Sequence, residues 1–306
     1  MIKSVIITNP LGESLKLVLT EPEKSGFIVK SIEGLGPVKA NIHTLDLATL
    51  DGSLDNGARL GTRNIVFSLE FYGTNIEDIR QKTYRYFPIK QNITMTFITD
   101  NRECYTTGRV ESNEPDIFSK NEGCQISVIC PNSYFYKLKE EIKDFFGENP
   151  AFEFPFENNS STLEEVDSNP VIEMGEIQTV TGGSLYYTGD AEVGVIIQVH
   201  ALGDAKNFTI YNTDTRESMA ISDSLLEELT GSGITTGDTI TINTNKGNKS
   251  VYLLRDGQYT NILNTLGFPI DWFTLKRGDN TFVFDAEEGI YNLQYKMSYN
   301  ITYEGI

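Results

Sequence analysis

The sequence holds few residues that could perform acid–base or nucleophilic chemistry. Its two histidines, His43 and His200, are far apart in the chain and form no HxxxH or HxH pair, so each is expected to be a structural or surface residue rather than a ligand or general base. No GxSxG motif marks a nucleophilic serine. Carboxylate pairs such as Asp190 with Glu192 fit a solvated acidic face better than a glycosidase dyad. We therefore expect no catalytic residue, no enzyme activity and no cofactor.

Two glycine-bearing loops fail as ligand sites. "DGSLDNGARLG", residues 51–61, has oxygen-bearing side chains at the first, third and fifth positions of a calcium loop. An EF-hand needs glycine at the sixth position and a bidentate glutamate at the twelfth, where this chain has Asn56 and Thr62. "GSGITTG", residues 231–237, lacks a P-loop lysine, and the Rossmann spacing would put its third glycine at Thr236. We expect no metal site and no phosphate cradle.

The three cysteines, Cys104, Cys124 and Cys130, form no CxxC pair. "ECYTTGRVE" and "CQISVICP" have the patterns of strands, which places all three thiols on strands and puts Cys124 and Cys130 on one face with Ile126 and Val128. We expect reduced thiols that pack as small buried hydrophobes and have no reactive role.

One aromatic pair is a candidate for binding a sugar. Trp272 is the only tryptophan, and Phe273 follows it. Neighbouring strand residues point to opposite faces, so one of the two is expected to be exposed unless a second layer covers it. An exposed ring on a β-sandwich could stack on a glycan. The alternative is that both rings pack in a core or under a loop.

Charge is unevenly spread along the 306 residues, whose net charge is -18. Residues 1–150 hold 17 basic and 20 acidic residues, and residues 151–306 hold 8 basic and 23 acidic residues. Neither half has a basic stripe, so nucleic acid is not an expected partner. No apolar stretch approaches the roughly 18 residues of a membrane span, and the first apolar run is too short for a signal peptide. We expect synthesis in the cytoplasm and no membrane insertion.

The first half alternates between strand signals and polar turns. A turn at residues 9–12 joins two strands, and residues 64–72 alternate cleanly, with four apolar side chains from Ile65 to Phe71 on one face. The long segment before this strand, residues 37–61, is polar and punctuated by glycines, and we interpret it as a loop.

One short helix is expected after this strand. Thr74 and Glu77 have the spacing of a capping box, and Pro88 supplies the stop. The helix should pack on a sheet, because one of its sides gathers Ile76, Ile79, Thr83 and Phe87. The N-terminal domain is therefore expected to be β-rich (α+β) with one packed helix.

The second half is a series of short strands separated by turn residues, which indicates an antiparallel β-sandwich or jelly roll and a mainly β protein. "SDSLLEELTG" predicts one or two helical turns ending at Gly231, and residues 137–146 allow one more. We expect an N-terminal domain over residues 1–146, a linker over 147–168 and an acidic β-sandwich over 169–306.

The chain resembles a known family, the distal tail proteins (Dit, siphovirus-type tail component) of long-tailed bacteriophages and related tail-like particles. The resemblance covers residues 1–136 and the end of the chain. It rests on "GLGPVKANI" with the loop after it, "GTRNIVFSLEFYG", "NIEDIRQKTYRYF", "ISVICPNSYFY" and the terminal "SYNITYEGI". The acidic half is compatible with the galectin-like second domain that such proteins often carry.

The resemblance implies structural work in a virion. Proteins of this family form a homohexameric ring from their N-terminal domains at the end of the tail tube. The ring joins the tube to the baseplate or to the tail-tip receptor-binding apparatus. The expected partners are therefore further copies of this chain, the tail tube protein and a tail-tip or baseplate protein, and the expected location is the tail tip.

A ring closed by a heterologous interface needs an element that reaches the next subunit. We predict that residues 38–62 form a projecting arm that contacts the next protomer or the tail tube; the alternative is an ordinary mobile hairpin loop. The residues predicted to make these contacts are His43, Leu45, Leu47, Leu50, Leu54, Arg59 and Arg63.

Two other functions compete with the structural hub. The β-sandwich could be an adhesion module that binds host surface carbohydrate through Trp272 or Phe273, and this function is compatible with the hub. A cell-wall hydrolase is the third hypothesis, and it has neither a motif nor more than coincidental carboxylates in its favour.

Overall fold

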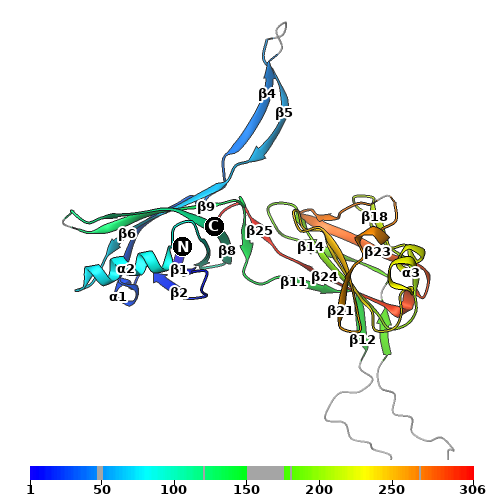
Figure 1. Ribbon diagram of the computed structural model, residues 1–306. Coiled ribbons are helices and arrows are strands. Elements are labelled where there is room, and N and C mark those ends of the chain that lie inside the picture. Colours follow the sequence, from blue (N-terminus) through cyan, green and yellow to red (C-terminus); the bar gives the residue numbers. More distant parts are fainter. Residues whose placement is uncertain (47–50, 120, 150–175, 180, 269) are drawn as a thin grey trace, which may run out of the picture. The chain divides into compact units, whose positions relative to one another are not determined.

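The computed structural model describes the 306 residues except for positions 47–50, 120, 150–175, 180 and 269. Antiparallel sheets dominate this described part (Figure 1), which confirms the mainly β fold class. The helical elements are short: α1 Pro22–Ser25, α2 Ile76–Tyr86, α3 Asp223–Thr230 and the 3-10 turns η1 Leu263–Thr265 and η2 Ile290–Asn292.

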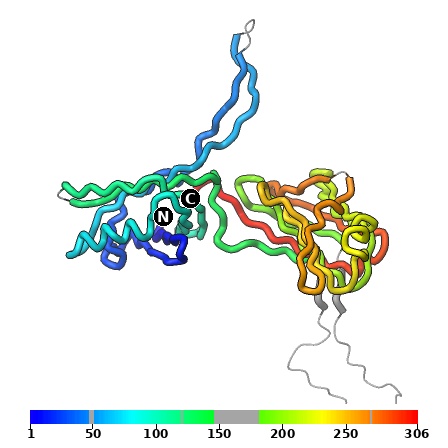
Figure 2. The backbone as a smooth tube through the Cα atoms, in the orientation of Figure 1, coloured from blue at the N-terminus to red at the C-terminus, as the bar shows by residue number. Residues whose placement is uncertain are grey.

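The chain divides into two compact units. Unit 1 consists of residues Met1–Glu140, Gly189–Ala191 and Asn300–Ile306, and unit 2 consists of residues Glu141–Thr188 and Glu192–Tyr299. The C-terminal segment thus returns to the unit in which the chain begins, as the tube in Figure 2 shows. Most of the predicted linker, from residue 150 onwards, lies outside the described residues.

Unit 1 is built on one antiparallel sheet, which has nine strands within the described residues. Its main path runs β2-β1-β7-β8-β9-β6-β3, and β10 pairs with β8 and β25. The strands of this sheet are β1 Ile2–Thr8, β2 Ser14–Val18, β3 Phe27–Glu33, β6 Arg63–Phe71, β7 Asn92–Thr99, β8 Glu103–Asp116, β9 Gly123–Cys130, β10 Phe135–Lys137 and β25 Thr302–Tyr303. Two further strands, β4 Ala40–Asp46 and β5 Ser53–Leu60, pair with each other.

The core of unit 1 follows the predicted alternation. Ile65, Phe67, Leu69 and Phe71 on β6 are all buried, and each such side chain contributes roughly 1.5–3 kcal/mol when it leaves water. The rings of Phe67 and Phe87 lie 5.7 Å apart between their centroids. This contact packs the C-terminal end of α2 onto the sheet, as predicted.

The N-cap of helix α2 lies one residue after the predicted one. The capping residue is Asn75, whose side-chain oxygen accepts the backbone N–H of Asp78 at 3.4 Å. The predicted capping box at Thr74 is therefore wrong by one position. The competing spacing Asn-x-x-Asp is shifted by one residue from Thr-x-x-Glu, and asparagine is the stronger capping residue.

The first hairpin is joined to the end of α2. Its turn lies at residues 9–12 as predicted, and Oδ1 of Asn9 accepts the backbone N–H groups of Leu11 and Glu13, each at 3.0 Å. The Glu13 carboxylate accepts a 2.7 Å hydrogen bond from Nε of Arg85. The hydrogen bonds from Arg85 and then Asn9 lower the pKa of Glu13 to about 2, so this carboxylate stays ionised at neutral pH.

Unit 2 is a sandwich of two antiparallel sheets, one ordered β11-β24-β16-β19-β20-β21 and the other β14-β23-β17-β18. The strands of the first sheet are β11 Glu141–Asp144, β16 Ile196–Ala201, β19 Thr239–Asn243, β20 Ser250–Arg255, β21 Gln258–Asn261 and β24 Leu293–Tyr299. Those of the second are β14 Gly182–Tyr187, β17 Lys206–Asn212, β18 Glu217–Ala220 and β23 Gly278–Glu288. Two small ladders pair β12 Phe146–Asn149 with β13 Glu176–Thr179 and β15 Val193–Gly194 with β22 Thr274–Leu275.

Aromatic side chains join the two sheets of unit 2. The rings of Phe284 on β23 and Tyr295 on β24 stack with their centroids 3.8 Å apart. Helix α3 ends at Gly231 with φ of 84°, as predicted. The helical turn allowed over residues 137–146 is wrong, because this segment forms strands that pair with distant parts of the chain, and such pairing overrides local propensity.

The position of the α2 cap can be tested by stability. We expect Asn75→Ala to lower the free energy of unfolding of unit 1 by about 1 kcal/mol, because it removes the side-chain acceptor at the helix start. Thr74→Ala should change it by less than about 0.5 kcal/mol. Urea unfolding followed by circular dichroism measures both, and equal losses would contradict the assignment.

Candidate assembly surface

Residues 40–60 form a two-stranded hairpin, which we call the arm. Strand β4 pairs with β5 from Ala40 opposite Leu60 to Asp46 opposite Ser53, with one bulge after Ile42. The sequence predicts a loop here, so the strands are a correction. Neither strand packs on a core, and therefore the sequence lacks the alternation by which strands are recognised.

The arm is exposed along its length. Every side chain from Asn41 to Asp46 and from Ser53 to Arg59 is exposed. Leu45 and Leu54 sit directly opposite each other, with exposed fractions of 55% and 54%. An isolated two-stranded hairpin is marginally stable in water, so an arm with an exposed apolar pair has a physical reason to bind a partner.

Most predicted contact residues lie where a partner could reach them. His43, Leu45, Leu54 and Arg59 are exposed on the arm, and their contacts remain a prediction. Leu47 and Leu50 lie outside the described residues. Ile42 of the arm is also exposed, at 68%, although it is not among the predicted contact residues. A β-branched residue in a polar segment is the sequence signal for it.

Arg63 is not an exposed contact residue, and its assignment to the arm surface is corrected. The side chain is 1% exposed and its guanidinium lies 4.2 Å from the ring centroid of Phe135. Burial lowers the pKa of this guanidinium, but arginine keeps its charge in proteins. The charge is therefore held inside unit 1.

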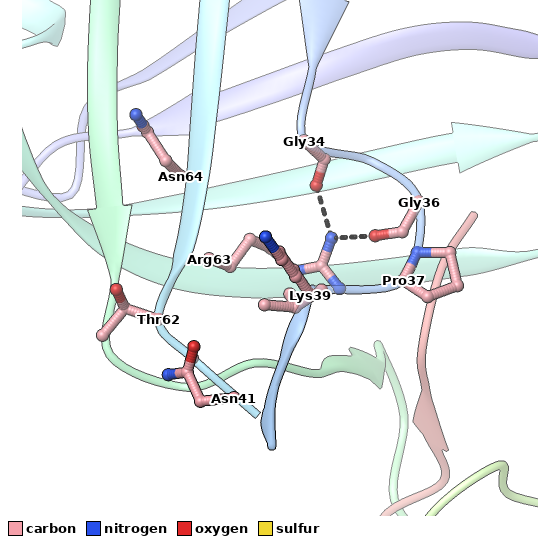
Figure 3. Close-up of a pocket in the computed structure, with 10 residues that line it drawn as sticks. Gly34, Gly36, Pro37, Lys39, Asn41, Thr62, Arg63 and Asn64 are labelled. Atoms are coloured by element: carbon pink, nitrogen blue, oxygen red, sulfur yellow. Dashed lines mark hydrogen bonds between the residues drawn. The ribbon is translucent and has the colours of Figure 1, made fainter. Parts of the chain in front are cut away.

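Backbone carbonyls surround the Arg63 guanidinium. Ser133 O accepts hydrogen bonds from Nε at 3.0 Å and from Nη2 at 2.7 Å, and Nη2 also donates to Glu304 O at 2.7 Å. Nη1 donates to Gly36 O at 2.7 Å and also to Gly34 O (Figure 3). Arg63 thus joins the chain before the arm, the turn after β9 and the C-terminal segment.

A groove of about 450 Å³ lies at the base of the arm. Figure 3 shows the side chains around it, with Arg63 turned toward the two glycine carbonyls. The lining residues are Gly34, Gly36, Pro37, Val38, Lys39, Asn41, Gly61, Thr62, Arg63 and Asn64. The set includes two cations and no carboxylate, so the groove favours a polar or anionic partner.

The C-terminal segment completes the base of the arm. Ile306 N donates to Leu35 O at 3.1 Å, and Lys137 N donates to Ile301 O at 2.8 Å. The ring of Tyr303 lies 4.6 Å below the Arg102 guanidinium. A segment more than 200 positions along the chain therefore fixes the backbone from which the arm starts.

The cysteines behave as the sequence predicts. Cys104, Cys124 and Cys130 are free and buried on β8 and β9. Burial raises the pKa of Cys104 and Cys124 to about 12 and that of Cys130 to about 11. The thiols therefore stay protonated, and protonated thiols are poor nucleophiles.

The aromatic pair offers little for stacking on a sugar. Phe273 is fully buried, with its ring centroid 5.8 Å from that of Phe282, and its assignment as a glycan-stacking residue is corrected. Trp272 is partly exposed, and Nζ of Lys249 lies 5.1 Å from its ring centroid. The lysine covers one face of that ring.

Chemistry-bearing side chains do not gather in the described residues. His43 belongs to the arm of unit 1, and His200 lies on β16 of unit 2 with Nδ1 3.0 Å from Oγ1 of Thr239. No group of three or more His, Cys, Asp or Glu residues is placed to hold a metal ion in this part of the chain. None of the helices found there is long and apolar enough to span a membrane.

The second half of the chain matches a known family. Residues 188–303 match the family model described as the C-terminal domain of the siphovirus-type tail component. No curated protein matches the chain in sequence. With the structural likeness given next, the family match confirms the resemblance to distal tail proteins.

Two solved structures share the fold over nearly the whole chain. The SPP1 Dit protein (gp 19.1), described as a paradigm of the hub adsorption apparatus in phages that infect Gram-positive bacteria, matches with a TM-score of 0.65 and 13% identity, covering 97% of this chain and 98% of that one. A chain of the phage P2 baseplate in its activated conformation with Ca matches with a TM-score of 0.50 and 11% identity over 100% of both chains. At these identities the two structural matches show that the chain shares the fold of these proteins.

The importance of Arg63 can be measured against an exposed arginine. We expect Arg63→Met to lower the free energy of unfolding of unit 1 by at least about 2 kcal/mol, because it leaves several carbonyls without donors. The matched control Arg109→Met, at an exposed arginine of β8 outside the arm, should change it by less than about 0.5 kcal/mol. Urea unfolding measures the free energy of unfolding of both variants. Equal effects of the two substitutions would contradict a stabilising role for the Arg63 hydrogen bonds.

The cysteines give a second test. We expect none of the three thiols to react with iodoacetamide in the folded protein near neutral pH, because they are buried and protonated. All three should react after unfolding in concentrated guanidinium chloride. Mass spectrometry counts the added groups, and rapid labelling of the folded protein would show that a thiol is accessible.

Proposed function

We propose that this protein is a structural hub at the distal end of a phage tail, where copies form a homohexameric ring that joins the tail tube to the baseplate or tail-tip apparatus. The observation that carries the proposal is the exposed β4–β5 arm, on a chain whose fold matches the SPP1 Dit protein over nearly its whole length.

The arm is suited to a heterologous contact. Its apolar pair, Leu45 and Leu54, has no covering partner among the described residues. Burying two leucine side chains is worth roughly 1.5–3 kcal/mol each. A contact between the arm of one copy and a different surface of the next repeats around an axis and closes a ring.

The partners and location follow from this role. We infer that the ring meets the tail tube protein on one side and a tail-tip or baseplate protein on the other, and that the protein works in the virion at the tail tip. The low net charge of residues 1–150 allows these segments to approach one another, whereas the acidic residues 151–306 repel their counterparts.

The carbohydrate-binding alternative stays a prediction without a supported site. Phe273 is buried and Lys249 covers one face of Trp272. The hydrolase hypothesis gains no support from the comparisons either, because the matched proteins are tail and baseplate components.

The arm can be tested by deletion. We expect the intact protein to form six-fold rings in light scattering and negative-stain images, and a variant lacking residues 45–58 to be monomeric. Circular dichroism and an unchanged urea midpoint would show that the deletion variant folds. The same oligomer with and without the arm would end the proposal for this segment.

A point variant makes the test sharper. The double variant Leu45→Ser with Leu54→Ser should raise the dissociation constant of the assembly at least about tenfold, because it removes the apolar contact. A tenfold change corresponds to 1.4 kcal/mol. The matched control is Leu225→Ser with Leu229→Ser on α3, where the leucines are 41% and 49% exposed. Equal association of the two double variants would contradict a contact through the arm.

A further inference from the structure

The charges of the arm are separated along its length. Asp46 pairs with Ser53 in the last rung of the ladder, and Asp51 lies beyond it. Lys39 and Arg59 lie at the other end, where Asn41 pairs with Arg59. Asp55, opposite Thr44, adds a third carboxylate on the half of the arm nearer the tip. All five of these charged side chains are exposed, and none of them forms an ion pair within the described part of the chain. The arm therefore has an acidic tip and a basic base.

The two ends cannot neutralise each other within one arm. Seven strand residues run from Ala40 to Asp46, and at about 3.3 Å per residue they span roughly 23 Å. The Debye length at physiological ionic strength is about 8 Å. Each end thus keeps its own local charge and is available to an opposite charge on another molecule.

The base offers a shaped surface as well as charge. Lys39 lines the groove of Figure 3 with Asn41, Thr62 and Asn64, whose polar groups can bind a carboxylate or a backbone. The Arg63 charge beneath the groove is satisfied by carbonyl dipoles and has no carboxylate partner among its hydrogen bonds. Glu33 precedes Gly34 in the chain, and the backbone of Glu304 accepts a hydrogen bond from Arg63, but neither residue lines the groove.

We propose that the acidic tip of each arm, through Asp46 and Asp51, docks on the groove and the cations Lys39 and Arg59 at the base of the arm of the next copy. The proposal rests on the proposed ring and names the surface that receives the arm. Tip and base are different surfaces, so each copy gives one contact and receives one, which is the heterologous pattern that a ring requires. Complementary charge fixes this register and disfavours tip-to-tip pairing.

Two charge-reversal variants, one at the base and one at the tip, test this contact separately and as a mixture. The base variant is Lys39→Glu with Arg59→Glu, and the tip variant is Asp46→Lys with Asp51→Lys. Each alone should associate at least tenfold more weakly than the wild type, because like charges then face each other. An equimolar mixture should recover assembly, because both contacts between the variants are again between opposite charges.

The control and the salt dependence separate this contact from general charge effects. Lys16→Glu with Lys82→Glu changes two exposed cations of unit 1 outside the arm and should leave assembly unchanged. Raising the salt concentration should weaken association of the wild type and strengthen association of each single-end variant. Light scattering and sedimentation velocity on the full chain measure all of these, and circular dichroism checks folding.

The outcomes distinguish the contact from the ring itself. A wild type that stays monomeric would overturn the proposed ring and this contact with it. A wild type that forms rings, with variants that assemble equally well or a mixture that fails to recover, would overturn only the tip-to-base contact. Closed dimers as the sole assembly would show that two arms pair reciprocally, which also overturns it.

Discussion

One buried cation joins the three chain segments at the base of the arm. The Arg63 guanidinium donates to carbonyls before the arm, after β9 and near the end of the chain. A charged donor strengthens each of these bonds, and the fixed fork of arginine allows several at once. Without it, buried carbonyls would lose their partners. The base of the arm is therefore held by a residue whose own side chain is almost fully buried.

A fixed base gives the arm its value as a contact element. An exposed hairpin that moved freely would lose conformational freedom on binding, and that loss weakens association. The structure gives the arm an ordered ladder on an anchored base, so less freedom remains to be lost. In the proposed contact the apolar pair supplies contact area and the separated charges supply register. That proposal assigns stability and assembly to different residues of one segment.

The sequence predicts the packed parts of this molecule better than its exposed or long-range parts. The strand through Phe67, the helix after it and the strands that carry the cysteines each have an apolar face that packs in the core. That face can be recognised in the sequence. The arm gave no such pattern because both its faces are exposed. Arg63 was misassigned because a buried charge is rare and its carbonyl partners, Ser133 and Glu304, lie far away in the sequence. The sequence does not single out Asn75, because two capping patterns are shifted by only one residue and either could cap the helix.

The long-range contacts also order events along the chain. The bonds from Arg63 to Glu304 and from Ile306 to Leu35 form only after the strands of unit 2 have been synthesised. Contacts of such high sequence separation close slowly, because the loop between them must first be ordered. We therefore expect the base of the arm to reach its final form late in folding. A chain interrupted before these residues lacks both contacts, so its arm starts from a backbone that nothing at the C-terminal end holds.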